Sequence, residues 1–324
     1  MKSISAVDLH FLTKELCILQ GALVDKFYAH DNDIYIRWYS SQAGKPLLVI
    51  TPKILFLQKK KPAISTASGF CQWLRKYLDR ARLTSITQLP GQRIMRLVLE
   101  KEKTYHVYIE LFNKGNIVVC DDKNNILAVR ERQAWKDRKV APGEQYTQEE
   151  REFLLTQTRD NILAQLLASP DNASKSIARY IGKHYALEAC ERAHVDAQAT
   201  ITTENAQSLA TALATFAEEP LAPQLYGTPD HIELITPFPF TSLDDSTPLS
   251  SLSKGYALIY AQTIDIPPSP YEQKLEKIKE RIRAQEERKQ MLRQEAQENQ
   301  RIGELLYEQY GTISEILDGI KKAR

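Results

Sequence analysis

The spacing of apolar residues changes twice along this chain, and no single regular architecture accommodates all three patterns. Up to about Arg130, short runs alternate between apolar and polar positions, as in Asp33–Tyr39, which predicts half-buried strands. From residue 147 to 218 the apolar residues recur every three or four positions, which predicts helices. From Tyr271 onward they follow a seven-residue repeat. The sequence therefore predicts an α+β chain built from successive parts.

The first part, residues 1–146, is expected to be a mixed α/β domain with a largely antiparallel sheet. Apolar residues at steps of three and four predict one helix at residues 5–23 and another at 69–81. Alternating and β-branched runs predict the strands, which fall at residues 33–39, 46–57, 93–100, 104–111, 116–120 and 126–130.

The second part, residues 147–219, is expected to be a small helical domain. Its helices are predicted at residues 148–156, 160–168, 175–181, 186–193 and 203–218. Residues 220–270 are rich in Pro and Ser, but they contain strand-like stretches at 231–236 and 256–262. This segment is therefore expected to return to the first sheet as strands.

Residues 271–324 are expected to form one charged helix of a coiled-coil arm. Gln285, Lys289 and Asn299 interrupt its apolar seam, and the helix could break at Gly311. Such a seam is buried only against another helix, so we expect a partner helix from another chain, unless the chain has been cut here. The seam consists of Leu275, Ile278, Ile282, Leu292, Leu306, Ile313, Leu317 and Ile320.

Charge is distributed unevenly along the chain. Residues 51–140 contain 19 Lys and Arg against 8 Asp and Glu, whereas residues 141–270 contain 7 against 17. A basic block beside an acidic one favours a face that binds a polyanion such as RNA. Two ordinary domains of unequal charge are the alternative.

Several classes of protein find no support in the sequence. Cys17, Cys71, Cys120 and Cys190 form no CxxC pair, and the six histidines show no HxH or HxxxH spacing, so neither a metal site nor a disulfide framework is predicted. Nucleotide-binding glycine motifs and a GxSxG nucleophile motif are also missing, so we expect neither a cofactor nor catalysis. The N-terminus does not resemble a signal peptide, and no apolar run approaches a membrane span, which favours a cytoplasmic protein.

Six ordered segments, which together extend over nearly the whole chain, resemble the NFACT family. Each segment alone is a weak motif, and their order and spacing carry the resemblance. The segments are ISAVDLHFLTKEL with the following GALVDKFY, ASGFCQWLRKYLDRARLTSITQ, GQRIMRLVLE, YIELFNKGNIVVCDDKNNIL, YIGKHYALEACERAHVD and YEQYGTISEILDGI.

The resemblance implies a glycosylase-like N-terminal domain, a helix-hairpin-helix domain and a coiled-coil arm, in that order. It also implies a non-enzymatic protein whose partners are tRNA and the rRNA of the large ribosomal subunit, bound when a nascent chain is stuck there. Several family members support untemplated C-terminal tailing of that chain, while the ribosome itself performs peptide transfer.

The same resemblance points to individual RNA-binding residues. The family's Asp-Arg pair aligns with Gln92 and Arg93, so the arginine is kept and the carboxylate is replaced by a neutral amide. Arginine binds phosphate in bidentate fashion or stacks on a base, whereas the alternative for Arg93 is a strand-surface charge. Asp8 matches an acidic position of the family, and its alternative is a first-turn carboxylate stabilised by the helix dipole.

Further residues are candidates for phosphate contacts, with a solvated polar surface as the alternative for each. Arg75, Lys76 and Arg80 follow one edge of the predicted helix at 69–81. The hairpin at residues 180–186 keeps Gly182, but other positions where the family has glycine carry side chains. The remaining candidates are Lys59, Lys60 and Lys61 in a loop, Lys114 and Asn116 beside Gly115, and Lys183 in that hairpin.

Three other functions stay open on the sequence. The chain could be an RNA- or protein-binding module that does not support tailing. It could be a fibronectin-binding type of adhesin, although no signal peptide or surface anchor is recognisable. It could also be a DNA glycosylase relative, but such enzymes use an N-terminal proline followed by glutamate, and this chain begins Met1-Lys2-Ser3.

Overall fold

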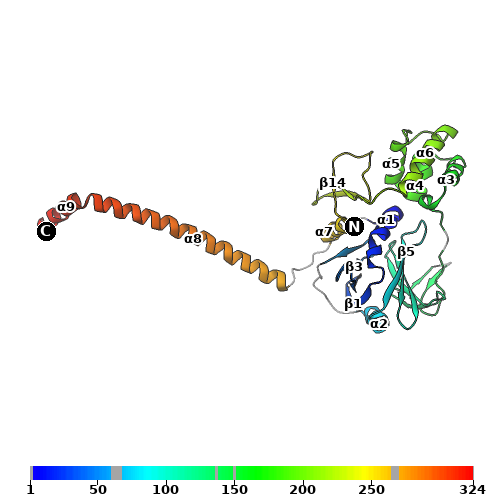
Figure 1. The fold of residues 1–324 in the computed structure, drawn as a ribbon, viewed down its shortest axis with the longest axis horizontal. Coiled ribbons are helices and arrows are strands. Elements are labelled where there is room, and N and C mark those ends of the chain that lie inside the picture. Colours follow the sequence, from blue (N-terminus) through cyan, green and yellow to red (C-terminus); the bar gives the residue numbers. More distant parts are fainter. Residues whose placement is uncertain (1–2, 60–67, 136–137, 149–150, 264–269, 324) are drawn as a thin grey trace. The chain divides into compact units, whose positions relative to one another are not determined.

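The computed structural model describes residues 3–59, 68–135, 138–148, 151–263 and 270–323, and it divides the chain into two compact units, Met1–Asp265 and Ile266–Arg324 (Figure 1). The predicted contacts of Lys60 and Lys61 lie outside the described residues. Within the described part of the first unit, nine strands form one antiparallel sheet, in the order β4-β3-β2-β1-β5-β6-β7-β8-β9. The mixed α+β class with a large antiparallel sheet is therefore confirmed.

The sheet consists of two meanders that meet at one residue pair. Leu23 of β1 pairs with Arg82 of β5, and the two strands diverge from there. The sequence pattern missed both of these strands because their polar residues obscure the alternation. The strands are β1 (Leu23–His30), β2 (Asp33–Tyr39), β3 (Leu47–Ile50), β4 (Leu55–Gln58), β5 (Arg82–Gln88), β6 (Ile94–Glu100), β7 (Thr104–Glu110), β8 (Asn116–Cys120) and β9 (Ile126–Val129).

The first predicted helix is shorter than expected. Helix α1 (Ala6–Leu16) and a 3-10 turn (Cys17–Leu19) end before Gly21, whose φ of +83° turns the chain into β1. Helix α1 buries an apolar face that includes Leu9, Phe11 and Leu12, and it packs against β5. The second predicted helix is present as α2 (Gly69–Leu78), which is capped by the Ser68 hydroxyl and packs on β1.

Four of the predicted helices of the second part are present, namely α3 (Arg159–Leu167), α4 (Ala173–Ile181), α5 (Lys183–Arg192) and α6 (Thr203–Phe216). The helix predicted at residues 148–156 is wrong for the residues described there, which contain only a 3-10 turn, Leu154–Thr156. Phe153, Leu154 and Leu155 are all buried, so tertiary packing covers this short apolar run although it forms no α-helix.

The segment after α6 returns to the first sheet differently from the prediction. Among its described residues, β12 (Gln224–Gly227), β13 (Ile232–Thr236) and β14 (Ser246–Pro248) form a separate small sheet. The strand predicted at residues 256–262 is wrong, because those residues lie in helix α7 (Leu252–Thr263). The Glu15 carboxylate accepts the first N–H groups of that helix, at 2.7 Å from Leu252 and 3.1 Å from Ser253. Tyr256, Ile259 and Tyr260 then form its buried face against β4.

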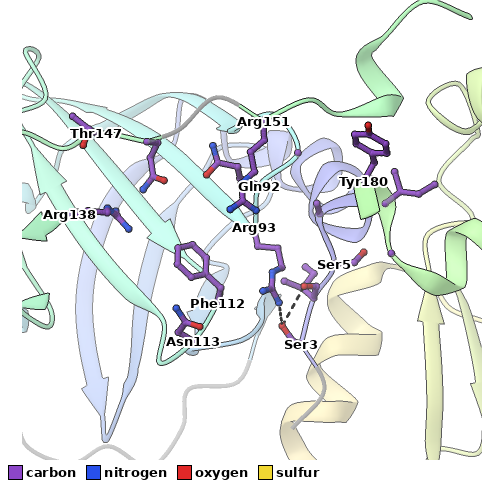
Figure 2. Close-up of a pocket in the computed structure, with 16 residues that line it drawn as sticks. Ser3, Ser5, Gln92, Arg93, Phe112, Asn113, Arg138, Thr147, Arg151 and Tyr180 are labelled. Atoms are coloured by element: carbon purple, nitrogen blue, oxygen red, sulfur yellow. Dashed lines mark hydrogen bonds between the residues drawn. The ribbon is translucent and has the colours of Figure 1, made fainter. Parts of the chain in front are cut away.

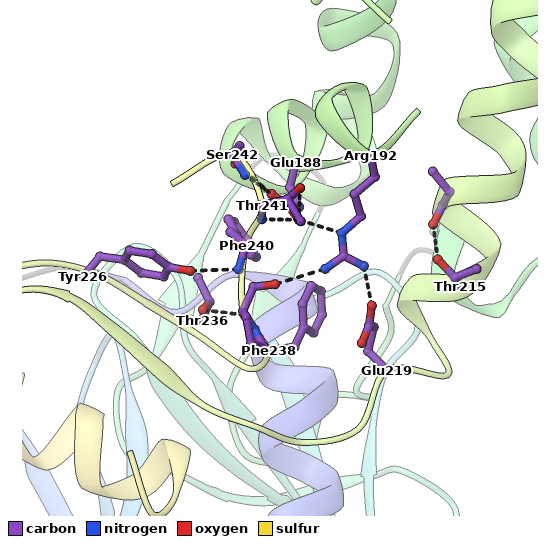
Figure 3. A network of polar contacts seen from close by, with 12 residues as sticks. Glu188, Arg192, Thr215, Glu219, Tyr226, Thr236, Phe238, Phe240, Thr241 and Ser242 are labelled. Atoms are coloured by element: carbon purple, nitrogen blue, oxygen red, sulfur yellow. Dashed lines mark hydrogen bonds and ion pairs between the residues drawn. The ribbon is translucent and has the colours of Figure 1, made fainter. Parts of the chain in front are cut away.

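A buried polar network connects the small sheet to α5 (Figure 3). Glu188 is fully buried and accepts the backbone N–H groups of Thr241 and Ser242 at 2.9 and 3.0 Å. It also accepts Arg192 Nε at 2.6 Å. Arg192 additionally donates to Glu219 and to the Pro239 carbonyl, and it lies over the Phe238 ring at 5.1 Å. Every charge in this network has an opposite charge beside it.

The second unit contains helices α8 (Pro270–Glu308) and α9 (Tyr310–Lys322). The predicted helix is therefore interrupted at Gln309, two positions before Gly311. Seam residues such as Ile278, Ile282 and Leu292 are about half exposed. No described helix of the chain is both long and apolar enough to cross a membrane.

Candidate functional site

A cavity of about 840 Å³ lies where five separate segments of the first unit meet (Figure 2). These segments are residues 3–6 at the start of the chain, the β5–β6 turn, the stretch that follows β7, the α4–α5 turn, and the described residues Arg138, Thr147, Gln148 and Arg151. Its described lining residues are Ser3, Ile4, Ser5, Ala6, Gly91, Gln92, Arg93, Phe112, Asn113, Arg138, Thr147, Gln148, Arg151, Tyr180, Ile181 and Gly182.

Two glycines give the cavity its shape. Gly91 has a φ of +63°, and a Cβ there would lie 2.8 Å from the Glu152 carbonyl oxygen, so only glycine lets the β5–β6 turn approach the segment that carries Arg151. Gly182 has a φ of +86° and joins α4 to α5. No side chain caps the N-terminus of α5.

Arg93 and Arg151 are close enough to affect each other electrostatically. Arg93 is half-buried and donates from Nη1 to the Ser3 hydroxyl at 2.8 Å. Burial, followed by the positive charge of Arg151, lowers the pKa of the Arg93 guanidinium. Neither arginine forms an ion pair with a described residue. The cavity thus brings two like charges together without a described counterion.

Arg138 contributes a third guanidinium, and this one is paired. Its Nη2 donates to buried Glu110 at 2.5 Å, and Glu110 also accepts the Tyr146 hydroxyl at 2.9 Å and the Gln148 amide at 3.2 Å. The Arg138 Nε is buried and has no hydrogen-bond partner among the described residues. A buried unpaired N–H costs about 1–3 kcal/mol, so this wall of the cavity retains an unused donor.

Of the predicted RNA-binding residues, Gln92 and Arg93 line this cavity. Gln92 is mostly buried, and its carbonyl accepts the Gln88 side-chain amide at 2.8 Å. Lys183 is exposed and directly follows Gly182 of the lining. Lys114 is exposed and directly follows Asn113 of the lining. The structure therefore gathers four of the predicted positions on or beside one cavity.

Asp8 and Asn116 do not line the cavity, and their side chains instead form hydrogen bonds within the fold. Asp8 is 8% exposed, and it accepts the Ser5 N–H at 2.9 Å and the Tyr185 hydroxyl, while its own N–H donates to the Ser5 hydroxyl at 3.0 Å. Asn116 is also buried, donates to the Glu131 carbonyl at 2.9 Å and accepts the Ile117 N–H at 2.9 Å. These bonds support a capping role for Asp8, and for Asn116 a role in linking the start of β8 to the backbone of Glu131 beyond β9.

Gly115 directly precedes Asn116 at the start of β8 and has the backbone role expected of it. Its φ is +63°, and a Cβ at this position would lie 2.5 Å from the Pro52 Cα. The family-like turn therefore requires glycine for packing rather than for ligand contact.

The basic residues of α2 form a separate surface. Arg75, Lys76 and Arg80 are exposed, and Arg75 donates from Nε to the Phe27 carbonyl at 2.9 Å. Helix α2 leads into Arg82 at the start of β5, whereas the cavity lies beyond the end of that strand at Gln88. Six residue steps of a strand at roughly 3.3 Å each separate these two ends by about 20 Å. Lys59 is likewise exposed, directly after β4 at the sheet edge.

Ser3, Arg138 and Arg151 are cavity residues that the sequence did not single out. Arg138 falls within the basic block of residues 51–140, so the charge pattern contained a signal for it. Arg151 follows Glu149 and Glu150 in the acidic block, and averaging charge along the chain hides it. The described residues also include no cluster of three or more His, Cys, Asp or Glu side chains that could hold a metal ion.

Comparison with known protein families gives one assignment. The family model described as NFACT N-terminal and middle domains matches residues 5–323. The archaeal Rqc2 homolog aRqcH of Methanocaldococcus jannaschii is 25% identical over all of this chain, which corresponds to 53% of that protein. The human ribosome quality control complex subunit NEMF is 34% identical over 45% of this chain and 14% of its own length. The chain thus spans about half the length of the archaeal relative and a smaller share of the human one.

Solved structures agree on the fold. The N-terminal part of the fibronectin/fibrinogen-binding protein from Streptococcus suis superimposes with a TM-score of 0.67, at 18% identity, over 80% of this chain and 99% of that one. The fibrinogen-binding protein from Staphylococcus aureus gives a TM-score of 0.65 at 17% identity, over 79% of this chain and 98% of that one. At these identities the likeness concerns architecture alone.

Proposed function

The chain belongs to the NFACT family, and on that premise we propose that it is a non-enzymatic RNA-binding component of ribosome quality control. Relatives that are similar over part or all of the chain are named as ribosome quality control subunits or as an Rqc2 homolog. In this proposal the chain acts in the cytoplasm on the large ribosomal subunit, and it positions tRNA while the ribosome performs the peptide transfer.

The observation that carries the proposal is the arginine-lined cavity. Arg93, at the position of the family's Asp-Arg pair, lies in the cavity together with Arg138 and Arg151. Guanidinium groups bind phosphate in bidentate fashion and stack on bases, so such a cavity suits RNA. The exposed Lys114 and Lys183 beside it extend the positive surface.

The neutral Gln92 favours RNA binding without the tailing that some family members support. A carboxylate beside Arg93 would orient the guanidinium or accept a hydrogen bond from a base edge, and an amide carries no charge for either task. We therefore propose that the chain holds RNA, and that tailing by this chain is weak or absent.

The test is sedimentation of a lysate on sucrose gradients at two salt concentrations, combined with sequencing of the RNA crosslinked to the protein. We expect co-migration with free large subunits, weaker at high salt, and tRNA crosslinks that are lost in Arg93→Ala. Lys103→Gln is the matched control, because Lys103 is exposed in the β6–β7 turn, at the opposite end of β6 from Arg93. Migration only at the top of the gradient, without tRNA crosslinks, would refute the proposal.

A further inference from the structure

The cavity has a marked charge imbalance in its described lining. Three of its described lining residues are arginines, and none is Asp or Glu. Among the described residues, Arg138 has Glu110 as its counterion, but Arg93 and Arg151 form no ion pair. Two neighbouring guanidinium groups repel each other, and an anion placed between them removes that repulsion.

The arginines of the lining have hydrogen-bond donors without a described acceptor. Arginine presents five N–H donors, and the described bond of Arg93 is a single one to the Ser3 hydroxyl. The buried Nε of Arg138 has no partner among the described residues. A ligand rich in acceptor oxygens therefore matches this cavity better than the amide and carbonyl edges of a base, which also present donors.

An aromatic ring lies on the same wall as Arg93. Phe112 is half-buried and lines the same cavity as Arg93 (Figure 2). A ring in a concave site offers a stacking face to a base only when that base is unpaired, because paired bases are stacked within their own helix.

We propose that this cavity binds a backbone phosphate of single-stranded RNA between the guanidinium groups of Arg93 and Arg151, with an adjoining unpaired base against Phe112. The inference rests on the proposed RNA-binding function and specifies the chemical group that enters the site. The phosphate oxygens accept from both arginines, and recognition at this point depends on charge rather than on base identity.

The neutral side chain of Gln92 is part of this arrangement. Gln92 lines the same cavity as both arginines. A carboxylate at this position would compete with the phosphate for Arg93, whereas an amide carries no charge with which to form an ion pair to that arginine. Among the described lining residues, Arg93 therefore has no carboxylate neighbour that would compete with an incoming anion.

The experiment measures binding of a fluorescein-labelled oligouridine RNA by fluorescence anisotropy. Inorganic phosphate replaces chloride at constant ionic strength, so any competition reports a phosphate site rather than screening. For the wild-type chain we expect phosphate to displace the RNA. Arg151→Gln should lower RNA affinity about tenfold and remove the competition, while Gln92→Asp should lower the affinity with Arg93 and Arg151 intact.

Lys103→Gln removes one exposed positive charge away from the cavity and should bind RNA within about twofold of wild type. Thermal melting of each variant checks that it is folded. The inference is overturned if Arg151→Gln binds like wild type, if Gln92→Asp binds more tightly, or if phosphate competes equally in wild type and Arg151→Gln.

Failure of the inference is distinguishable from failure of the proposed function. RNA binding that depends on Arg93 but responds neither to phosphate nor to Arg151→Gln refutes the phosphate site and leaves RNA binding intact. Saturable binding of inorganic phosphate, followed by arginine Nε–Hε resonances in ¹H–¹⁵N spectra, together with no binding of any RNA, refutes the RNA function and, with it, RNA as the ligand of this anion site.

Discussion

Two arginine clusters in the first unit differ in whether carboxylates neutralise the arginine charge. Around Arg192, burial alone would lower the pKa of the guanidinium, but the carboxylates of Glu188 and Glu219 outweigh it and raise that pKa. Around Arg93, burial and the positive Arg151 both lower the pKa. One cluster is internally neutralised, and the other has a surplus of positive charge among its described residues.

The difference separates structural roles from binding roles. The Arg192 cluster connects α5 to the chain that follows β13, and its hydrogen bonds are made within the protein (Figure 3). The Arg93 cluster lines a cavity, and the buried Nε of Arg138 there has no hydrogen-bond partner in the part of the chain that the structure describes. Charges that stabilise a fold are paired within it, whereas charges kept unpaired in a concave site reduce stability and favour an external anion.

The largest expected effect comes from breaking the paired cluster. Glu188→Ala leaves Arg192 without one counterion and leaves the N–H groups of Thr241 and Ser242 without their acceptor. Loss of one partner of a buried ion pair should lower the free energy of unfolding by about 3 kcal/mol. Urea unfolding monitored by circular dichroism measures this change.

The matched comparison is Arg93→Gln in the cavity. The described side-chain bond of Arg93 is to Ser3, and removing its charge also removes repulsion with Arg151, so stability should change little. If Arg93→Gln destabilised the chain as much as Glu188→Ala does, the division between a structural and a binding cluster would be wrong.

The sequence predicted the periodic elements of the fold and missed those that depend on distant residues. Helix α2 and β2 carry their own apolar spacing, so local sequence was sufficient. Helix α7 was predicted as a strand because its helical start depends on Glu15, more than two hundred residues away in the sequence. The helix predicted at 148–156 is wrong for the described residues, where Glu152 packs closely against the Gly91 turn and only a 3-10 turn forms at Leu154–Thr156.

The candidate site was predictable only in part for the same reason. Arg93 was found through its resemblance to a family motif, and Lys183 through its hairpin. Arg151 lies in an acidic stretch, and only the close approach of Gly91 to residues 151–152 places it beside Arg93. The capping role of Asp8 depends on Ser5, three residues away, so local sequence could suggest it, whereas its hydrogen bond from Tyr185 on α5 could not be predicted from local sequence.

A smaller effect should appear in the pH dependence of stability. Burial by itself raises the pKa of Glu188, but hydrogen bonds from Thr241, Ser242 and Arg192 outweigh it and hold that pKa below the ordinary value of 4.5. This carboxylate therefore contributes stability above pH 4.5, and the contribution is lost as the pH falls through its lowered folded-state pKa. Glu188→Gln should therefore lose less stability than wild type as the pH falls. Urea unfolding midpoints, measured from acidic to neutral pH, test this.

Asp8 is a buried carboxylate whose pKa is shifted in the opposite direction from that of Glu188. Burial raises the pKa of its carboxyl above the ordinary 3.8 despite the bonds from Tyr185 and Ser5. Its contribution is therefore complete below pH 3.8 and is lost as the pH rises through the raised folded-state pKa. Asp8→Asn should gain stability relative to wild type as the pH rises, whereas Glu188→Gln should lose stability relative to wild type. Parallel pH profiles for the two variants would contradict these assignments.

The smallest effect tests the repulsion inside the cavity directly. Arg151 is exposed, and replacing it with Gln removes a like charge from beside Arg93, so the free energy of unfolding should rise slightly or stay within about 0.5 kcal/mol. Added salt screens the same repulsion, so wild type should gain more stability from salt than Arg151→Gln does, and phosphate should have a larger effect than chloride at equal ionic strength. Melting curves across both salts measure this, and a wild type less stabilised by salt than Arg151→Gln would mean that the charge of Arg151 is already neutralised within the fold.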